Sequence, residues 1–173
     1  DYNLAFGTYA LGMTDPIRDP NVLINWPVNT PARGETMLNR PLYHNLMKHK
    51  EYFAQYHAHF DQFLTGYFES GQCEAQVRQA QALIAPYVEA DPTAFCSYSD
   101  HLLAVDTLLA VCALRAQSVR GQLSGDYPIT LAQQAEHPGA GVDASHVDLR
   151  ALGDFQDLRE AKERQDMARE AVK

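Results

Sequence analysis

The stretch KEYFAQYHAHFDQFLTGYFES, residues 50–70, decides the fold. Its aromatic side chains recur at intervals of three and four residues, at Phe53, Tyr56, Phe60, Phe63 and Tyr67. Because an α-helix has about 3.6 residues per turn, this spacing places the rings along one face of a helix. Ser70 and Gly71 end the pattern. The stretch therefore predicts a long helix over 50–69 whose aromatic face packs into a core.

The same periodicity extends to both sides of this helix. Three further helices are predicted, over 41–48, 73–88 and 99–121. Pro86 lies near the end of one of them and is expected to kink or shorten it. Ser97 or Ser99 is expected to cap the last. The chain is therefore predicted to be mainly α.

The periodic positions also predict a core. Its members are Phe53, Tyr56, Phe60, Phe63, Ile84, Leu102, Leu109 and Cys112. If the Phe60 ring is fully buried, Phe60→Ala should cost roughly 3–5 kcal/mol of folding free energy.

Residues 8–40, before the helices, are rich in proline and other turn formers. Yet Leu23, Ile24 and Trp26 are too apolar for a free linker. An ordered loop that packs on the helices is predicted, and loops of this length inside compact domains are usually functional.

The chain is predicted to have two parts, 1–125 and 126–173. Glycine and proline breaks over 126–144 predict a loosely structured linker. A charged helix is predicted over 154–172, with a thin apolar stripe of Leu158, Ala161 and Ala168. It is expected to lie across the body or to pack on a second copy of the chain, as a possible homo-oligomer contact. Deletion of 145–173 is accordingly expected to leave the melting temperature nearly unchanged.

Composition limits the classes of partner. The chain has 173 residues and a formal net charge of −8, which argues against general binding of nucleic acid or anionic membranes. It contains no run of 18 apolar residues, so no membrane partner is predicted.

The three cysteines are far apart in sequence, which favours buried free thiols at Cys73, Cys96 and Cys112. One bridge, for instance Cys73 to Cys96, stays open, and so does the redox compartment.

The histidines do not predict a metal site. His57 and His59 are two residues apart and would point to different sides of a helix.

Asp1 is a stronger candidate metal ligand because it begins DYNLAFG, residues 1–7, which is typical of a strand running into a glycine turn. Asp1 and Asn3 fall on one face by strand alternation. Their oxygens suit Mg²⁺ beside the phosphates of a nucleotide.

Four stretches, in order, resemble the CotH proteins, atypical protein kinases named for a bacterial spore coat protein. The stretches are DYNLAFG (1–7), RPLYHNLMKHKEYFAQYHAHFDQFLTGYF (40–68), LIAPYVEADPTAF (83–95) and LRAQSVRGQL (114–123). The resemblance covers residues 1 to about 125. It implies the helical C-terminal lobe of a divergent protein-kinase-like fold, with a short strand and turn at the N-terminus.

The resemblance also implies an activity. The parent protein would transfer the γ-phosphoryl group of ATP to serine or threonine of proteins, for example spore coat or surface proteins. Asp1 would bind Mg²⁺, with Asn3 as a weaker second ligand. The catalytic Asp and the nucleotide-binding Lys are expected upstream of Asp1. The chain is therefore expected to be part of a larger domain, to hold no catalytic residue, to bind neither ATP nor Mg²⁺ alone, and to be inactive alone.

Two other functions remain open from the sequence. One is a non-catalytic helical scaffold or binding module of the spore coat or cell envelope, and the other is an unrelated helical binding module. The family suggests the spore coat, the cell surface or secretion as the location. A Lys and a second Asp upstream of Asp1 would favour the kinase.

Overall fold

The computed structural model describes residues 19–32, 37–94 and 96–153. These residues form helices, and no strand occurs among them. The elements are α1 (Pro20–Ile24), η1 (Met37–Asn39), α2 (Pro41–Met47), α3 (Lys50–Phe63), η2 (Leu64–Glu69), α4 (Gln72–Ala90), α5 (Tyr98–Ser124), α6 (Leu131–Glu136) and η3 (Leu149–Leu152). The mainly α prediction is confirmed. The predicted N-terminal strand and the charged helix over 154–172 lie outside the described residues.

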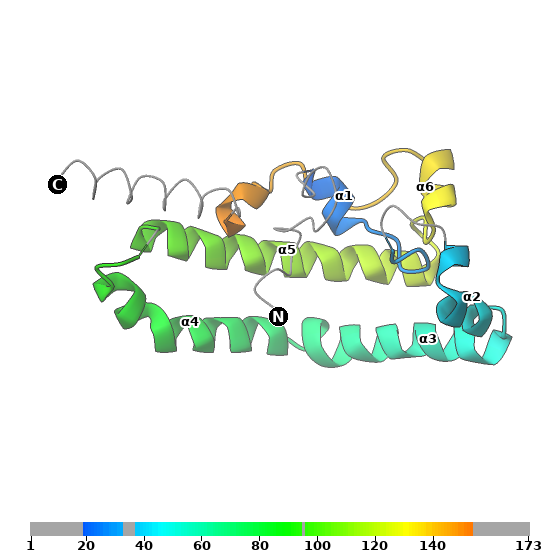
Figure 1. Cartoon of the computed structure of the whole chain (residues 1–173), viewed down its shortest axis with the longest axis horizontal. Coiled ribbons are helices and arrows are strands. Elements are labelled where there is room, and N and C mark those ends of the chain that lie inside the picture. The colour runs from blue at the N-terminus through cyan, green and yellow to red at the C-terminus, as the bar shows by residue number, and fades with distance from the viewer. Residues whose placement is uncertain (1–18, 33–36, 95, 154–173) are drawn as a thin grey trace.

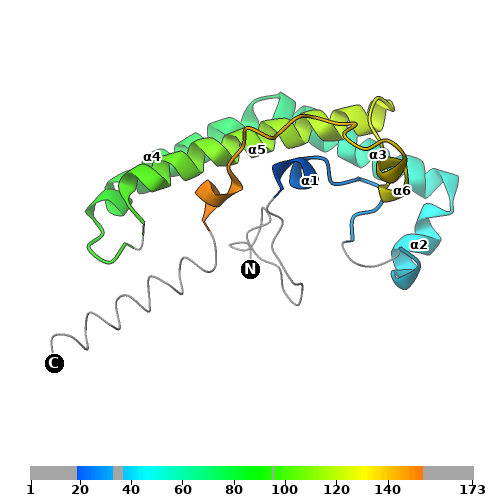
Figure 2. The same ribbon diagram turned by 90° about the horizontal axis from the view of Figure 1, so that it is seen from above.

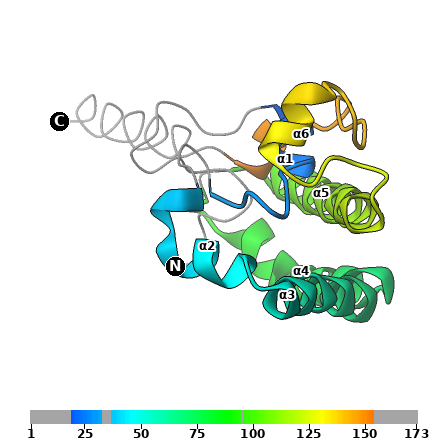
Figure 3. The ribbon, with the colours of Figure 1, turned by 90° about the vertical axis from the view of Figure 1, so that its right-hand side faces the viewer.

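The elements form layers around α5. α3, η2 and α4 follow one another as one long rod, and α5 runs back beside it (Figure 1). α1 and η3 contact α5 on its other side, where α6 also lies (Figures 1 and 2). The end view shows the same order, with α3 and α4 in one layer and α5 between them and α1 (Figure 3). α5 is thus the central element of the described structure.

The ends of the helices follow from local sequence. Ser97 caps α5 in a capping box: its hydroxyl accepts a hydrogen bond from the Asp100 amide at 3.1 Å, and the Asp100 carboxylate accepts one from the Ser97 amide at 3.0 Å. Pro86 does not shorten α4, because the helix continues to Ala90, and the alternative expectation of a kink stays a prediction. Proline removes only its own N–H donor, and the residues after it keep theirs.

The inward-facing side chains where α3 joins the π-helix η2 differ from the predicted stripe. Leu64 is 3% exposed and belongs to a core cluster with Val28 and Val119, against which Tyr56, Phe60 and Phe68 pack. Phe63, a predicted core residue and the last residue of α3, is 55% exposed. The predicted stripe is therefore wrong at Phe63.

The core consists of two clusters on α5. One joins Ile24, Val111, Ala144 and Val147, and the other joins Val28, Leu64 and Val119. Of the predicted core, Cys112 is buried, whereas Ile84 and Leu102 are exposed, like Phe63. Periodicity identifies an apolar face but not what covers it. Phe60 is only partly buried, so the cost of Phe60→Ala is expected to fall below the range for a fully buried ring.

The segment over 126–144 is ordered, contrary to the sequence expectation. It contains α6, and Ala144 at its end is fully buried. Side-chain oxygens of the α1 region satisfy its backbone: the Val142 amide donates to Asn25 Oδ1 at 2.9 Å and the Ala144 amide to Asn21 Oδ1 at 2.8 Å. These partners are more than a hundred residues away in the chain, so local composition does not indicate them. The division at residue 125 itself stays a prediction.

This packing changes the expected result of truncation. Val147, Leu149 and Leu152 pack with Ile24 and Val111. Deletion of 145–173 is therefore expected to lower the melting temperature, because it exposes this cluster, whereas deletion of 154–173 should leave it within a few degrees. Thermal melts of the two truncated chains distinguish these outcomes. Equal melting temperatures would contradict the assigned role of residues 145–153.

A close approach at Gly121 gives a second prediction. A Cβ atom there would overlap the ring of Tyr127, whose amide donates to the Gly121 carbonyl at 3.0 Å. Gly121→Ala is expected to lower the free energy of unfolding by roughly 1–3 kcal/mol through overpacking. Gly66 is the matched control because a Cβ there meets no atom within 4 Å. Gly66→Ala should be neutral or stabilise by up to about 1 kcal/mol, since alanine favours helix over glycine. Urea titration measures both, and equal effects would refute the packing argument.

Among the described residues, α5 alone is long and apolar enough to cross a membrane by length and composition. Central helices of globular domains share these properties, and α5 contacts α1, α3, α4, η2 and η3. About 17% of its most apolar window is buried within the structure. The absence of a membrane partner stays a prediction.

Candidate functional site

The predicted metal ligands, Asp1 and Asn3, lie outside the described residues. Within the described ranges, no group of three or more His, Cys, Asp or Glu side chains is placed to hold a metal ion. The predicted magnesium site therefore stays a prediction. The structure does describe the loop that follows α1, residues 25–31, hereafter the clamped loop.

Arg115 on α5 holds the start of the clamped loop. Its Nη1 donates to the carbonyl oxygens of Ile24 at 2.9 Å and Trp26 at 2.6 Å. Burial lowers the pKa of Arg115 to about 10. The guanidinium is therefore charged at neutral pH, and both hydrogen bonds are charge-assisted.

Gln122, one helical turn beyond Ser118 on α5, holds the middle of the loop. Its Oε1 accepts from the Val28 amide at 2.8 Å, and its Nε2 donates to Ser118 Oγ at 3.2 Å. Gln122 is 2% exposed and Ser118 is fully buried. Buried amides and hydroxyls are stable only when they are paired, so these two residues fix both the loop and each other.

Asn25 joins the clamped loop to the segment after α5. Its Oδ1 accepts from Ser118 Oγ at 2.8 Å and from the Val142 amide at 2.9 Å. Its Nδ2 donates to the carbonyls of Val142 at 2.9 Å and Asn21 at 3.0 Å. Gly141 permits this approach, since a Cβ there would lie 2.5 Å from Asn25 Oδ1. One side chain thus connects α1, α5 and the chain near residue 142.

Side chains of α3, which is part of the rod, hold the clamped loop from the opposite side. The Tyr56 hydroxyl donates to the Val28 carbonyl at 2.8 Å, and His57 Nε2 lies 2.8 Å from Asn29 Oδ1. Burial raises the pKa of Tyr56 and lowers the pKa of His57. Near neutral pH the phenol is therefore a proton donor and the imidazole is neutral. From α2, the Tyr43 hydroxyl donates to the Asn29 carbonyl at 3.1 Å.

This arrangement positions the backbone and supplies no chemistry of its own. Among the side chains described above, no nucleophile stands beside a paired base. The effect of the arrangement is to fix the chain just after α1. Sequence reasoning missed Asn25, Arg115, Ser118 and Gln122. The sequence does contain a signal for Arg115, Ser118 and Gln122. Polar residues at intervals of three and four on an otherwise apolar helix indicate a second, polar contact face.

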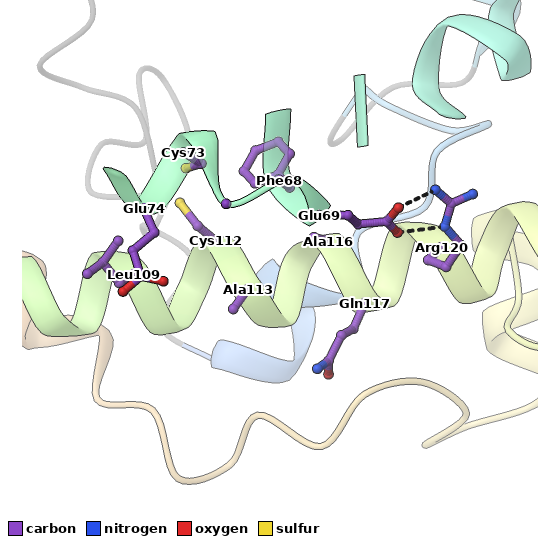
Figure 4. A pocket seen from close by; sticks show the side chains of 11 residues that line it. Phe68, Glu69, Cys73, Glu74, Leu109, Cys112, Ala113, Ala116, Gln117 and Arg120 are labelled. Atoms are coloured by element: carbon purple, nitrogen blue, oxygen red, sulfur yellow. Dashed lines mark hydrogen bonds and ion pairs between the residues drawn. The ribbon is translucent and has the colours of Figure 1, made fainter. Parts of the chain in front are cut away.

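A pocket of about 290 Å³ lies elsewhere, between η2, the start of α4 and α5 (Figure 4). Arg120 closes one end through an ion pair with Glu69, with Nε 2.8 Å from Oε1. Arg120 also pairs with Asp61 on α3. The guanidinium lowers the pKa of Glu69, which keeps the pair ionised. Cys73 and Cys112 line the other end of the pocket.

The described residues form a mainly α portion of a domain in which a central helix holds the preceding loop. The family model described as CotH kinase protein matches residues 1–122. The chain therefore belongs to the CotH kinase family, and the resemblance drawn from its four stretches is confirmed. No curated protein and no solved structure matches the chain.

Proposed function

We propose that the protein to which this chain belongs transfers the γ-phosphoryl group of ATP to serine or threonine hydroxyls of protein substrates, such as coat or surface proteins. The observation that carries the proposal is the match to the CotH kinase family over residues 1–122, which includes the predicted metal-binding stretch. The helical lobe and its central helix support the same assignment.

Asp1 and Asn3 are the residues that would hold Mg²⁺. Their carboxylate and amide oxygens fit this ion, which prefers oxygen ligands and is usually bound through one or two protein groups together with substrate phosphates. When bound, Mg²⁺ neutralises negative charge on the phosphates during transfer. Asp1 would orient the ion, and Asn3 would have the smaller effect.

The clamped loop has a positioning role in this proposal. In kinases the segment after the metal-binding Asp must be ordered for activity. Here Arg115, Gln122 and Tyr56 fix Trp26 and Val28, which come later in the chain than that stretch. Transfer of a phosphoryl group depends mainly on positioning and charge neutralisation, so a fixed attachment point for this segment serves the reaction.

The proposal is tested with the full-length protein, radiolabelled ATP and Mg²⁺. Label is expected on serine and threonine of the protein itself or of an added protein substrate, and chelation of Mg²⁺ should abolish it. A folded, monodisperse protein that transfers no label to any protein tested would favour the alternative, a non-catalytic helical scaffold.

A further inference from the structure

Two cysteines face each other between α4 and α5. Cys73 lies in the first turn of α4, Cys112 lies in the middle of α5, and both are buried, at 7% and 9% exposure. Their sulfur atoms point toward one another across the gap between the two helices (Figure 4). No metal-binding group of three residues includes them among the described side chains. The pair is therefore a dithiol without a built zinc site.

The surroundings keep the Cys112 thiol protonated and leave both sulfur atoms reachable. Burial and the neighbouring Cys73 thiol raise the pKa of Cys112 to about 12. Both residues line the pocket of about 290 Å³, which gives a small molecule a route to the sulfurs. Cys96, by contrast, is exposed in the turn between α4 and α5 and belongs to neither helix.

We propose that Cys73 and Cys112 form an intramolecular disulfide when the protein meets a low-molecular-weight disulfide such as oxidised glutathione. One thiol loses its proton and attacks the glutathione S–S bond, which releases one glutathione and leaves a mixed disulfide. The second thiol then attacks the protein sulfur of that mixed disulfide and releases the second glutathione. The two cysteines lose two electrons and two protons, and the oxidised glutathione gains them.

The bond would join elements that the backbone connects only through the turn after Ala90. It would tie the start of α4, beside the π turn, to the middle of the central helix. The closed loop contains about 40 residues, so the disulfide restricts the unfolded chain substantially. The raised pKa makes the reaction slow at neutral pH and faster as the pH rises, because only the thiolate attacks.

The test uses the Cys96→Ser chain, which removes the exposed thiol and its intermolecular products. After incubation with oxidised glutathione at alkaline pH, maleimide labelling of the unfolded protein should find no free thiol. Peptide mapping without reductant should recover a peptide that joins residues 73 and 112. The melting temperature should rise by roughly 5–10 °C and return after reduction.

The Cys73→Ser/Cys96→Ser and Cys112→Ser/Cys96→Ser chains are the matched controls. Each keeps one thiol, which can only take up a glutathione, and neither should gain thermal stability. Two free thiols in the oxidised Cys96→Ser chain, or a glutathione on each cysteine, would overturn the proposal. A cross-linked product that melts at a lower temperature would overturn the stabilising role of the bond.

Discussion

Asp1→Ala in the full-length protein is expected to lower the rate of phosphoryl transfer by orders of magnitude. A carboxylate that holds Mg²⁺ acts on the charge that develops in the transition state, where electrostatic groups have their largest effect. A single surface acid contributes little to folding stability as a rule, so we expect the fold to survive the substitution. Initial rates with labelled ATP, together with the melting temperature, measure the two effects separately.

Two further variants make this result specific. Asn3→Ala should reduce the rate less, because an amide oxygen is the weaker ligand. Asp106→Ala removes an exposed carboxylate of α5 and should leave the rate unchanged. If Asp1→Ala transfers phosphate within a few-fold of the wild-type rate, the metal assignment is wrong and the scaffold function gains support.

Asn25→Ala is expected to have the largest effect on stability, lowering the free energy of unfolding by about 4 kcal/mol. The side chain makes four hydrogen bonds, to Ser118, to both backbone groups of Val142 and to Asn21. Each contributes about 1 kcal/mol net, and the loss leaves the fully buried Ser118 hydroxyl without this acceptor. Urea unfolding of the full chain measures the change.

Asn45→Ala is the matched control for this substitution. Asn45 is exposed on α2 and accepts one hydrogen bond, from Lys48 Nζ at 3.3 Å. Its removal should change the free energy of unfolding by less than about 0.5 kcal/mol. Similar losses for the two variants would show that Asn25 does not hold the clamped loop in solution.

The sequence predicts the helices well because their signals are local. Phe53, Tyr56 and Phe60 repeat at helical spacing, and the capping box at Ser97 marks the start of α5. The prediction fails where local sequence does not determine which side chain enters the core. At the junction of α3 and η2, Leu64 joins Val28 and Val119 in the core, whereas Phe63 is exposed.

The site is less predictable than the helices. DYNLAFG indicates Asp1 and Asn3, but the clamped loop depends on pairs that are distant in the chain, such as Asn25 with Ser118. Hydrophobic periodicity carries no information about such polar pairs. The ordered segment over 126–144 was missed for the same reason, because its stability comes from Asn21 and Asn25 rather than from its own composition.

The long separation of these pairs has a consequence for synthesis on the ribosome. Asn25 binds Val142, which comes 117 residues later, and Asn21 binds Ala144, which comes 123 residues later. At about 5–20 residues per second, these partners emerge roughly 6–25 s after the loop. The hairpin of α3, α4 and α5, together with the bonds from Arg115, Gln122 and Tyr56 to the clamped loop, can form before these partners emerge. The side-chain oxygens of Asn21 and Asn25 stay bound to water until residues 142–144 arrive. The joint between α1 and the chain near residue 142 is then among the last parts of the described structure to become resistant to proteases.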